Sequence, residues 1–134
     1  MIVLDCSTAL SWFIPDEDST AARELRERVV REGAVVPSLW PIEVGNVLVF
    51  AMRRRRIDAA QRLAALEAFG ELPIEIDTET LTKVWRETLN LADEFRLTLY
   101  DACYLELAHR RELPLATHDQ ELRAAGKKLG IELL

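Results

Sequence analysis

The chain has 134 residues, a length that suits one hydrophobic core and predicts a single domain over residues 1–134. Hydrophobic residues make up 49% of the sequence and charged residues 30%, which excludes a disordered chain. The net charge of −6 does not by itself suggest a nucleic-acid binder, so any attraction for phosphates must come from local positive charge. Two cysteines exclude a disulfide framework, and we expect a reducing, cytoplasmic location.

Membrane insertion is not expected from the sequence. No stretch reaches the roughly 18 uninterrupted apolar residues of a membrane span, because Glu43 interrupts the only candidate. The apolar N-terminus has no basic segment and contains Asp5, so it predicts a first strand rather than a signal peptide.

The first half of the chain alternates short apolar runs with helical patterns. Residues 2–4 and 34–36 are β-branched runs that predict buried strands. Between them, Ser7 is a candidate N-cap for a short helix, and residues 19–31 predict an amphipathic helix. Residues 38 or 39 to 57 predict a helix that is apolar almost all round, which is typical of a helix that is central or covered by a partner.

The second half continues the alternation. The expected elements are a helix capped by Asp58 that ends near Gly70, a strand at 74–76, a long helix from Asp77 or Thr78 through Phe95, a helix at 99–111, a strand at 115–117, a helix at 119–129 and a short strand at 131–134. Short strands that alternate with helices predict an α/β domain with a parallel sheet and helices on both faces.

Four acids are placed where this topology would bring them together. Asp5 ends the first strand, Asp119 follows the fourth, and Glu43 and Asp101 lie in the first turns of helices. In open parallel sheets the functional crevice lies outside the carboxyl ends of the strands, and the helix N-termini face the same edge.

Each acid also has an ordinary structural explanation. Asp5 and Asp119 are plausible helix caps, and a helix dipole favours Asp101 in a first turn. Glu43 is harder to explain, because it lies in the most apolar segment, where a lone carboxylate costs several kcal/mol unless it is paired, protonated or metal-bound. Converging carboxylates need a compensating cation, and their all-oxygen set favours Mg²⁺ or Mn²⁺, which serve phosphoryl chemistry.

Four segments in this order carry a family resemblance: residues 2–7 (IVLDCS), 41–46 (PIEVGN), 99–104 (LYDACY) and 115–119 (LATHD) followed by Leu122. Together they resemble the PIN-domain ribonucleases, and more narrowly the VapC toxins of bacterial type II toxin–antitoxin pairs. The resemblance covers essentially the whole chain. It implies a three-layer α/β/α PIN domain around a central, mainly parallel sheet of four to five strands.

The resemblance also implies an activity and a set of site residues. It implies an endoribonuclease dependent on Mg²⁺ (or Mn²⁺), whose catalytic and metal-binding acids are Asp5, Glu43, Asp101 and Asp119. Ser7 and Thr117 would orient the acids or waters, and Asn46 would be a polar neighbour. The protein is further implied to be a homodimer that a cognate VapB-like antitoxin silences by covering the groove and presenting a basic residue to the acids.

The uninterrupted run Arg53, Arg54, Arg55 and Arg56 has two interpretations. As structure, these cations would stabilise the C-terminal end of a helix. As function, they could guide RNA phosphates towards the acidic site, which would otherwise repel them. His118, inside the last segment, is expected to face solvent.

Other functions on a similar fold fit the sequence less well. A response-regulator receiver would want paired acids after the first strand, where Asp5 stands alone, and a haloacid-type phosphatase would want an aspartate where Ser7 stands. A non-catalytic RNA- or protein-binding PIN-fold module would tolerate the loss of an acid, and none is missing. Cleavage of DNA stays open, because the metal chemistry does not discriminate between sugars.

Overall fold

A four-stranded parallel sheet forms the middle of the molecule in the computed structural model, which describes residues 1–134. Its strands are β1 (Ile2–Leu4), β2 (Ala34–Val36), β3 (Ile74–Ile76) and β4 (Leu115–Ala116), in the spatial order β3-β2-β1-β4. All three pairings are parallel. The central strands β1 and β2 are fully buried, which is why they appear in the sequence as continuous apolar runs.

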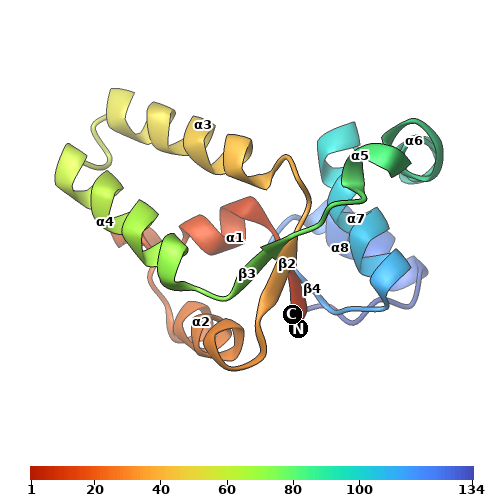
Figure 1. The fold of residues 1–134 in the computed structure, drawn as a ribbon, viewed down its shortest axis with the longest axis horizontal. Coiled ribbons are helices and arrows are strands. Elements are labelled where there is room, and N and C mark those ends of the chain that lie inside the picture. The colour runs from red at the N-terminus through yellow and green to blue at the C-terminus, as the bar shows by residue number, and fades with distance from the viewer.

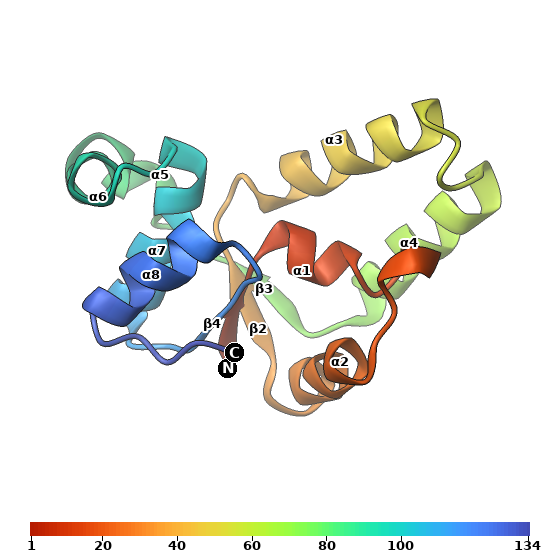
Figure 2. The same cartoon turned by 180° about the vertical axis from the view of Figure 1, so that it is seen from behind.

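Helices cover both faces of this sheet, as expected. They are α1 (Cys6–Leu10), α2 (Thr20–Glu32), α3 (Trp40–Arg53), α4 (Ala59–Glu71), α5 (Thr80–Lys83), α6 (Leu89–Phe95), α7 (Leu99–Arg111) and α8 (Gln120–Lys128). Figures 1 and 2 show α1, α2 and α4 on one side of the strands and α7 and α8 on the other, with the two chain ends close together. The three-layer α/β/α architecture is thereby confirmed. None of these helices combines the length and the apolar character that crossing a membrane requires.

The core is centred on α7 rather than on α3. Every residue of α7 from Ala102 to Ala108 is buried, and this helix packs against β1, β4, α6 and α8. In contrast, α3 buries one stripe and leaves apolar side chains such as Ile42, Val47 and Phe50 exposed. The almost wholly apolar pattern of α3 therefore does not reflect burial within this chain.

Two expected helix starts are confirmed by side-chain caps. Ser19 accepts a hydrogen bond from the backbone N–H of Ala22 at the start of α2. Asp58 and Gln61 bond each other's backbone N–H groups and form a capping box at the start of α4.

Some expected boundaries are wrong for local reasons. Ser7 is not an N-cap, because Asp5 holds that position before α1 and its side chain makes no capping bond. The helix expected to reach residue 57 ends earlier, since Arg55 adopts a left-handed conformation with φ of 55°. The long helix after Asp77 is divided between α5 and α6 by a π turn over Val84–Thr88. The strand expected at 131–134 is reduced to one bridge between Leu133 and Leu115.

Candidate active site

The order of the strands places a topological switch point between β1 and β4. The chain leaves β1 towards β2 on one side, while β4 pairs on the other side of β1. Crevices at such switch points are the usual ligand sites of open α/β sheets. The register pairs Leu4 with Ala116, so Asp5 and Thr117 leave the sheet side by side. The carboxyl end of this strand pair is the candidate active site.

Asp5 is fixed at the switch point by two hydroxyl groups. Its Oδ2 atom accepts hydrogen bonds from Ser7 Oγ and Thr117 Oγ1, both at 2.9 Å. The side chain is buried, with 7% of the residue exposed. The two hydroxyls bond one oxygen of the carboxylate and bring no positive charge to it.

Glu43 faces the same site from the first turn of α3, where it is half-buried. Its Oε1 atom accepts a hydrogen bond of 2.5 Å from the hydroxyl of Tyr104, which extends from α7. Burial raises the pKa of Glu43, the Tyr104 hydrogen bond opposes this, and the charges of Asp5 and Asp101 raise it further. The net shift is upward, and the contributions of Asp5 and Asp101 mean that these two carboxylates lie close enough to Glu43 to repel it.

Asp101 and Asp119 complete the group. Burial raises the pKa of Asp101, and the charges of Asp119 and Asp5 add to the rise. Asp119 is the N-cap of α8, where its Oδ1 atom accepts from the backbone N–H of Leu122 at 2.8 Å. Its own N–H donates to Thr117 Oγ1 at 3.1 Å. The capping role and a place among the acids therefore coexist in one residue.

The four acids share the absence of a positive partner. None of Asp5, Glu43, Asp101 and Asp119 takes part in an ion pair. As the side chains stand, no three His, Cys, Asp or Glu residues are grouped tightly enough to hold one metal ion. Mg²⁺ usually keeps several waters and is bound through one or two carboxylates and substrate phosphates. This open, all-oxygen donor set fits such an ion.

A fifth acid at the same edge shows the contrasting arrangement. Asp77 follows β3 and is as buried as Asp5, but both of its oxygens bond the guanidinium of Arg110, at 2.8 and 3.2 Å. Thr80 Oγ1 also donates to it at 2.8 Å. Burial would raise the pKa of Asp77, and the bonds from Arg110 and Thr80 outweigh it and lower the pKa. Asp77 is therefore a structural acid.

Two buried cysteines, Cys6 and Cys103, lie close enough to acids of the site to feel their charge. Burial raises the pKa of Cys6 to about 12, with contributions from the charges of Glu43 and Asp5. Burial raises the pKa of Cys103 to about 11, with contributions from Glu106 and Glu43. Without a metal ion, both thiols are therefore protonated at neutral pH.

The comparison with known families agrees with this arrangement. The sequence profile of the PIN domain family matches residues 2–128. The chain belongs to the PIN domain family. This confirms the expected fold family, whose members are generally metal-dependent nucleases.

Two solved structures share the architecture of this PIN domain. PAE2754 from Pyrobaculum aerophilum is 25% identical with a TM-score of 0.70, and the match covers 98% of this chain and 87% of that one. FitAcB from Neisseria gonorrhoeae is 12% identical with a TM-score of 0.69, over 100% of this chain and 96% of that one, and this likeness concerns the fold alone. No curated protein matches the sequence.

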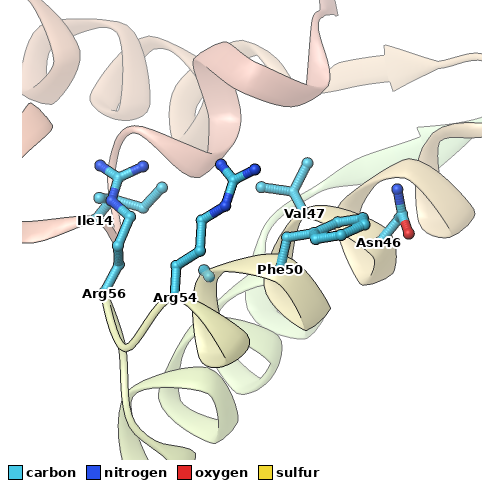
Figure 3. Close-up of a pocket in the computed structure, with 7 residues that line it drawn as sticks. Ile14, Asn46, Val47, Phe50, Arg54 and Arg56 are labelled. Carbon is cyan, nitrogen blue, oxygen red and sulfur yellow. The ribbon is translucent and has the colours of Figure 1, made fainter.

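The PIN domain has a pocket beside α3, and two arginines of the run at 53–56 line it. The pocket has a volume of about 260 Å³ and is lined by Ile14, Asn46, Val47, Phe50, Ala51, Arg54 and Arg56. Figure 3 shows Arg54 and Arg56 extending from the end of α3 towards the segment that holds Ile14. Asn46 is exposed here, one turn after Glu43, and makes no hydrogen bond to an acid.

The whole arginine run is exposed and makes no ion pair. The guanidinium groups of Arg53 and Arg54 lie over the ring of Phe50, at 5.6 and 5.8 Å from its centre. His118 is exposed and lines a separate pocket beside α2.

Tyr104 is a site residue to which sequence reasoning assigns no role. Its hydroxyl reaches Glu43 although the residue has no exposed surface. A signal was present in the sequence, because a buried tyrosine needs a partner for its hydroxyl. Its spacing of three residues from Asp101 also places both on one face of α7.

The pairing of Asp77 with Arg110 predicts a measurable loss of stability on substitution. Asp77→Asn should lower the free energy of unfolding in urea by about 3 kcal/mol, the low end for breaking a buried ion pair, because Glu106 still pairs with Arg110 at 2.7 Å. Asp93→Asn is the matched control, since Asp93 is exposed on α6 and has no hydrogen-bond partner. Equal stability of the two variants would contradict the structural role of Asp77.

The same pair predicts how this loss depends on pH. The lowered pKa of folded Asp77 means that its stabilisation is fully present above the pKa of the unfolded chain, about 3.9, and is lost as the pH falls towards the folded pKa. The difference in unfolding free energy between parent and Asp77→Asn should therefore be constant from neutral pH to about 5 and shrink below about 4. A difference that grows in acid has the wrong sign for this explanation.

Proposed function

We propose that this PIN domain is an endoribonuclease dependent on Mg²⁺ or Mn²⁺ and is the toxin of a toxin–antitoxin pair. One observation carries the nuclease proposal: four acids lie at the switch point of the sheet without any positive partner. Burial raises the pKa of Glu43 and Asp101, the charges of neighbouring acids add to the rise, and a bound cation would compensate these charges. The general metal dependence of PIN-domain nucleases supports the choice of ion.

The proposed reaction is hydrolysis of a phosphodiester bond in RNA. Asp5, Glu43, Asp101 and Asp119 would hold the ion or its waters, and Ser7 and Thr117 keep Asp5 in place for this role. The bound ion would supply activation of water and stabilisation of charge on the phosphate oxygens. The water oxygen bonds to phosphorus, one phosphorus–oxygen ester bond breaks, and the released ribose oxygen takes a proton.

Substitution of Asp5 tests the metal site. Asp5→Asn keeps the shape of the side chain and its hydroxyl partners and removes the negative charge. Cleavage of labelled RNA with Mg²⁺ or Mn²⁺ should then fall by more than about 100-fold, which exceeds the loss typical of a residue that only hydrogen-bonds a metal ligand. Asp93→Asn should cleave like the parent, and EDTA should abolish cleavage by both.

Two outcomes of this assay would reject the proposal. Equal rates for Asp5→Asn and the parent would remove Asp5 from the site. No metal-dependent cleavage by the parent would favour a non-catalytic RNA- or protein-binding module. Single-stranded DNA run beside the RNA separates a ribonuclease from a deoxyribonuclease.

The arginine run is proposed to attract RNA to the acidic site. The chain carries a net charge of −6, and Arg53 to Arg56 concentrate free positive charge at the end of the helix that also bears Glu43. Asn46 lies on α3 between Glu43 and this arginine run, and we propose that it is a polar neighbour of the RNA on its way to the acids. Specificity for an RNA sequence is not inferred from these contacts, because phosphate contacts position the strand without reading bases.

RNA affinity and its salt dependence test this role. Arg54→Gln with Arg56→Gln should weaken binding of uncleaved RNA in EDTA and reduce the slope of log K against log salt by about 1.4, since each phosphate contact on a single strand contributes about 0.7. Arg86→Gln is the control, because Arg86 is exposed in the π turn and makes no ion pair. A slope unchanged by the double substitution would exclude phosphate contacts.

A cognate antitoxin is proposed to cover α3 and the acids. The exposed apolar side chains Ile42, Val47 and Phe50 offer a surface for a helix or strand, and the uncompensated acids favour a basic residue from the partner.

The buried, unpaired cysteines Cys6 and Cys103 agree with the reducing cytoplasm where we expect the pair to act.

Purification of the complex tests this partnership. A short reading frame directly upstream should encode the antitoxin, and the complex should cleave no RNA and melt at a higher temperature than the free chain, because the partner binds only the folded state. An unchanged melting temperature, or full activity of the mixture, would contradict it.

A homodimer is proposed through the outer stripe of α5, the π turn and α6. Leu81, Trp85 and Leu89 are exposed at intervals of four residues, and Trp85 is 85% exposed. The pair Lys83 and Glu87 beside the stripe offers both charges, so the same patch on two copies could also form ion pairs across a twofold axis.

Light scattering after gel filtration tests the dimer. Trp85→Glu should convert a dimer into a monomer, because burying the new charge without a partner is unfavourable. Leu63→Glu, at an exposed leucine of α4, should leave the dimer intact. A monomeric parent at micromolar concentration would reject the proposal.

A further inference from the structure

Tyr104 joins the two helices that carry acids of the site. It lies on α7 one turn after Asp101, and its hydroxyl donates to Glu43 Oε1 on α3 at 2.5 Å. No other side-chain hydrogen bond connects α3 with the rest of the molecule. This single bond therefore links the position of one acid-bearing helix to the other.

The bond also determines where the Glu43 carboxylate can lie. A glutamate side chain has several rotatable bonds, and repulsion by Asp5 and Asp101 favours orientations that point away towards solvent. The Tyr104 ring is fixed by complete burial, so its hydroxyl is a rigid donor. It occupies Oε1 and leaves Oε2 without a side-chain partner.

A phenylalanine would fill the same buried space, so packing alone does not require the hydroxyl. The neighbouring Tyr100, one turn earlier on α7, is exposed and makes no side-chain hydrogen bond. The two tyrosines thus offer the same chemical group on one helix, with and without contact to an acid.

We propose that Tyr104 is a positioning residue that holds Glu43 towards Asp5 and Asp101 and leaves Oε2 as its metal-binding atom. This inference rests on the proposed metal site. Tyr104 touches neither RNA nor the ion in this role and acts only through Glu43.

Calorimetric titration of the metal-free 134-residue chain with Mn²⁺ tests the proposal without using activity. Tyr104→Phe should remain folded by circular dichroism and bind Mn²⁺ about 10-fold more weakly than the parent, at the low end of the loss for a partner of a metal ligand. Tyr100→Phe should bind like the parent. In the Glu43→Gln background, Tyr104→Phe should have no further effect, because the residue through which it acts is already changed.

The outcomes separate this proposal from the function on which it rests. If the parent binds Mn²⁺ and Glu43→Gln weakens binding, but Tyr104→Phe binds like the parent, the hydroxyl is merely structural and the positioning role is overturned. If Glu43→Gln binds like the parent, the positioning role fails while Asp5→Asn still tests the nuclease. If the parent binds no Mn²⁺, the proposed metal site and the positioning role fail together.

A measurement on the unmodified chain decides the case in which Tyr104→Phe fails to fold. The hydroxyl proton of Tyr104 should be protected from exchange and visible by proton NMR, and its resonance is identified by its displacement in Glu43→Gln. Addition of Mg²⁺ should shift it, since the ion would bind the carboxylate that accepts the proton. A resonance that Mg²⁺ leaves unchanged overturns the proposal.

Discussion

Repulsion among carboxylates at one edge of the sheet is the constraint on which the site depends. The chain resolves it in two ways. Asp77 receives a guanidinium from Arg110, and the pair becomes part of the fold. Asp5 and Glu43 receive only hydroxyl groups, which fix their oxygens and leave their charge in place. The second arrangement leaves the carboxylates to repel one another, which costs free energy, and a bound cation would compensate this repulsion. The choice of partner therefore separates the structural acid from the acids that we propose to bind a metal ion.

Short strands form this edge of the sheet. The strands of the sheet are at most three residues long, and the first two are wholly buried. Their carboxyl ends therefore lie close to the centre of the molecule, and an acid placed there is desolvated at once. The helix α7, buried from Ala102 to Ala108, packs against β1 and β4. That packing fixes Tyr104, so the same core that stabilises the domain also orients the site.

Local patterns in the sequence predict the parts of this structure that local physics decides. The buried strands follow from their apolar runs, and the start of α4 follows from the capping pair Asp58 and Gln61. The π turn is not predictable in this way, because its i→i+5 bonding extends over only five residues, too few to show a period of its own in the sequence. Asp5 and Asp77 show the deeper limit. Each is an aspartate directly after a three-residue strand, and the contact that distinguishes them, from Asp77 to Arg110, spans 33 residues of sequence.

The helix α3 connects the proposed interactions of this protein. Its first turn bears Glu43, its last bears Arg53, and its outer face bears Ile42, Val47 and Phe50. A partner that lies along this helix would meet the acidic site, the arginines and the apolar face together. One short segment of antitoxin would then block the ion, the RNA path and the exposed surface at once, with no change in fold. Because Glu43 is the only side chain of α3 hydrogen-bonded to another element, a movement of this helix would also move Glu43 within the site.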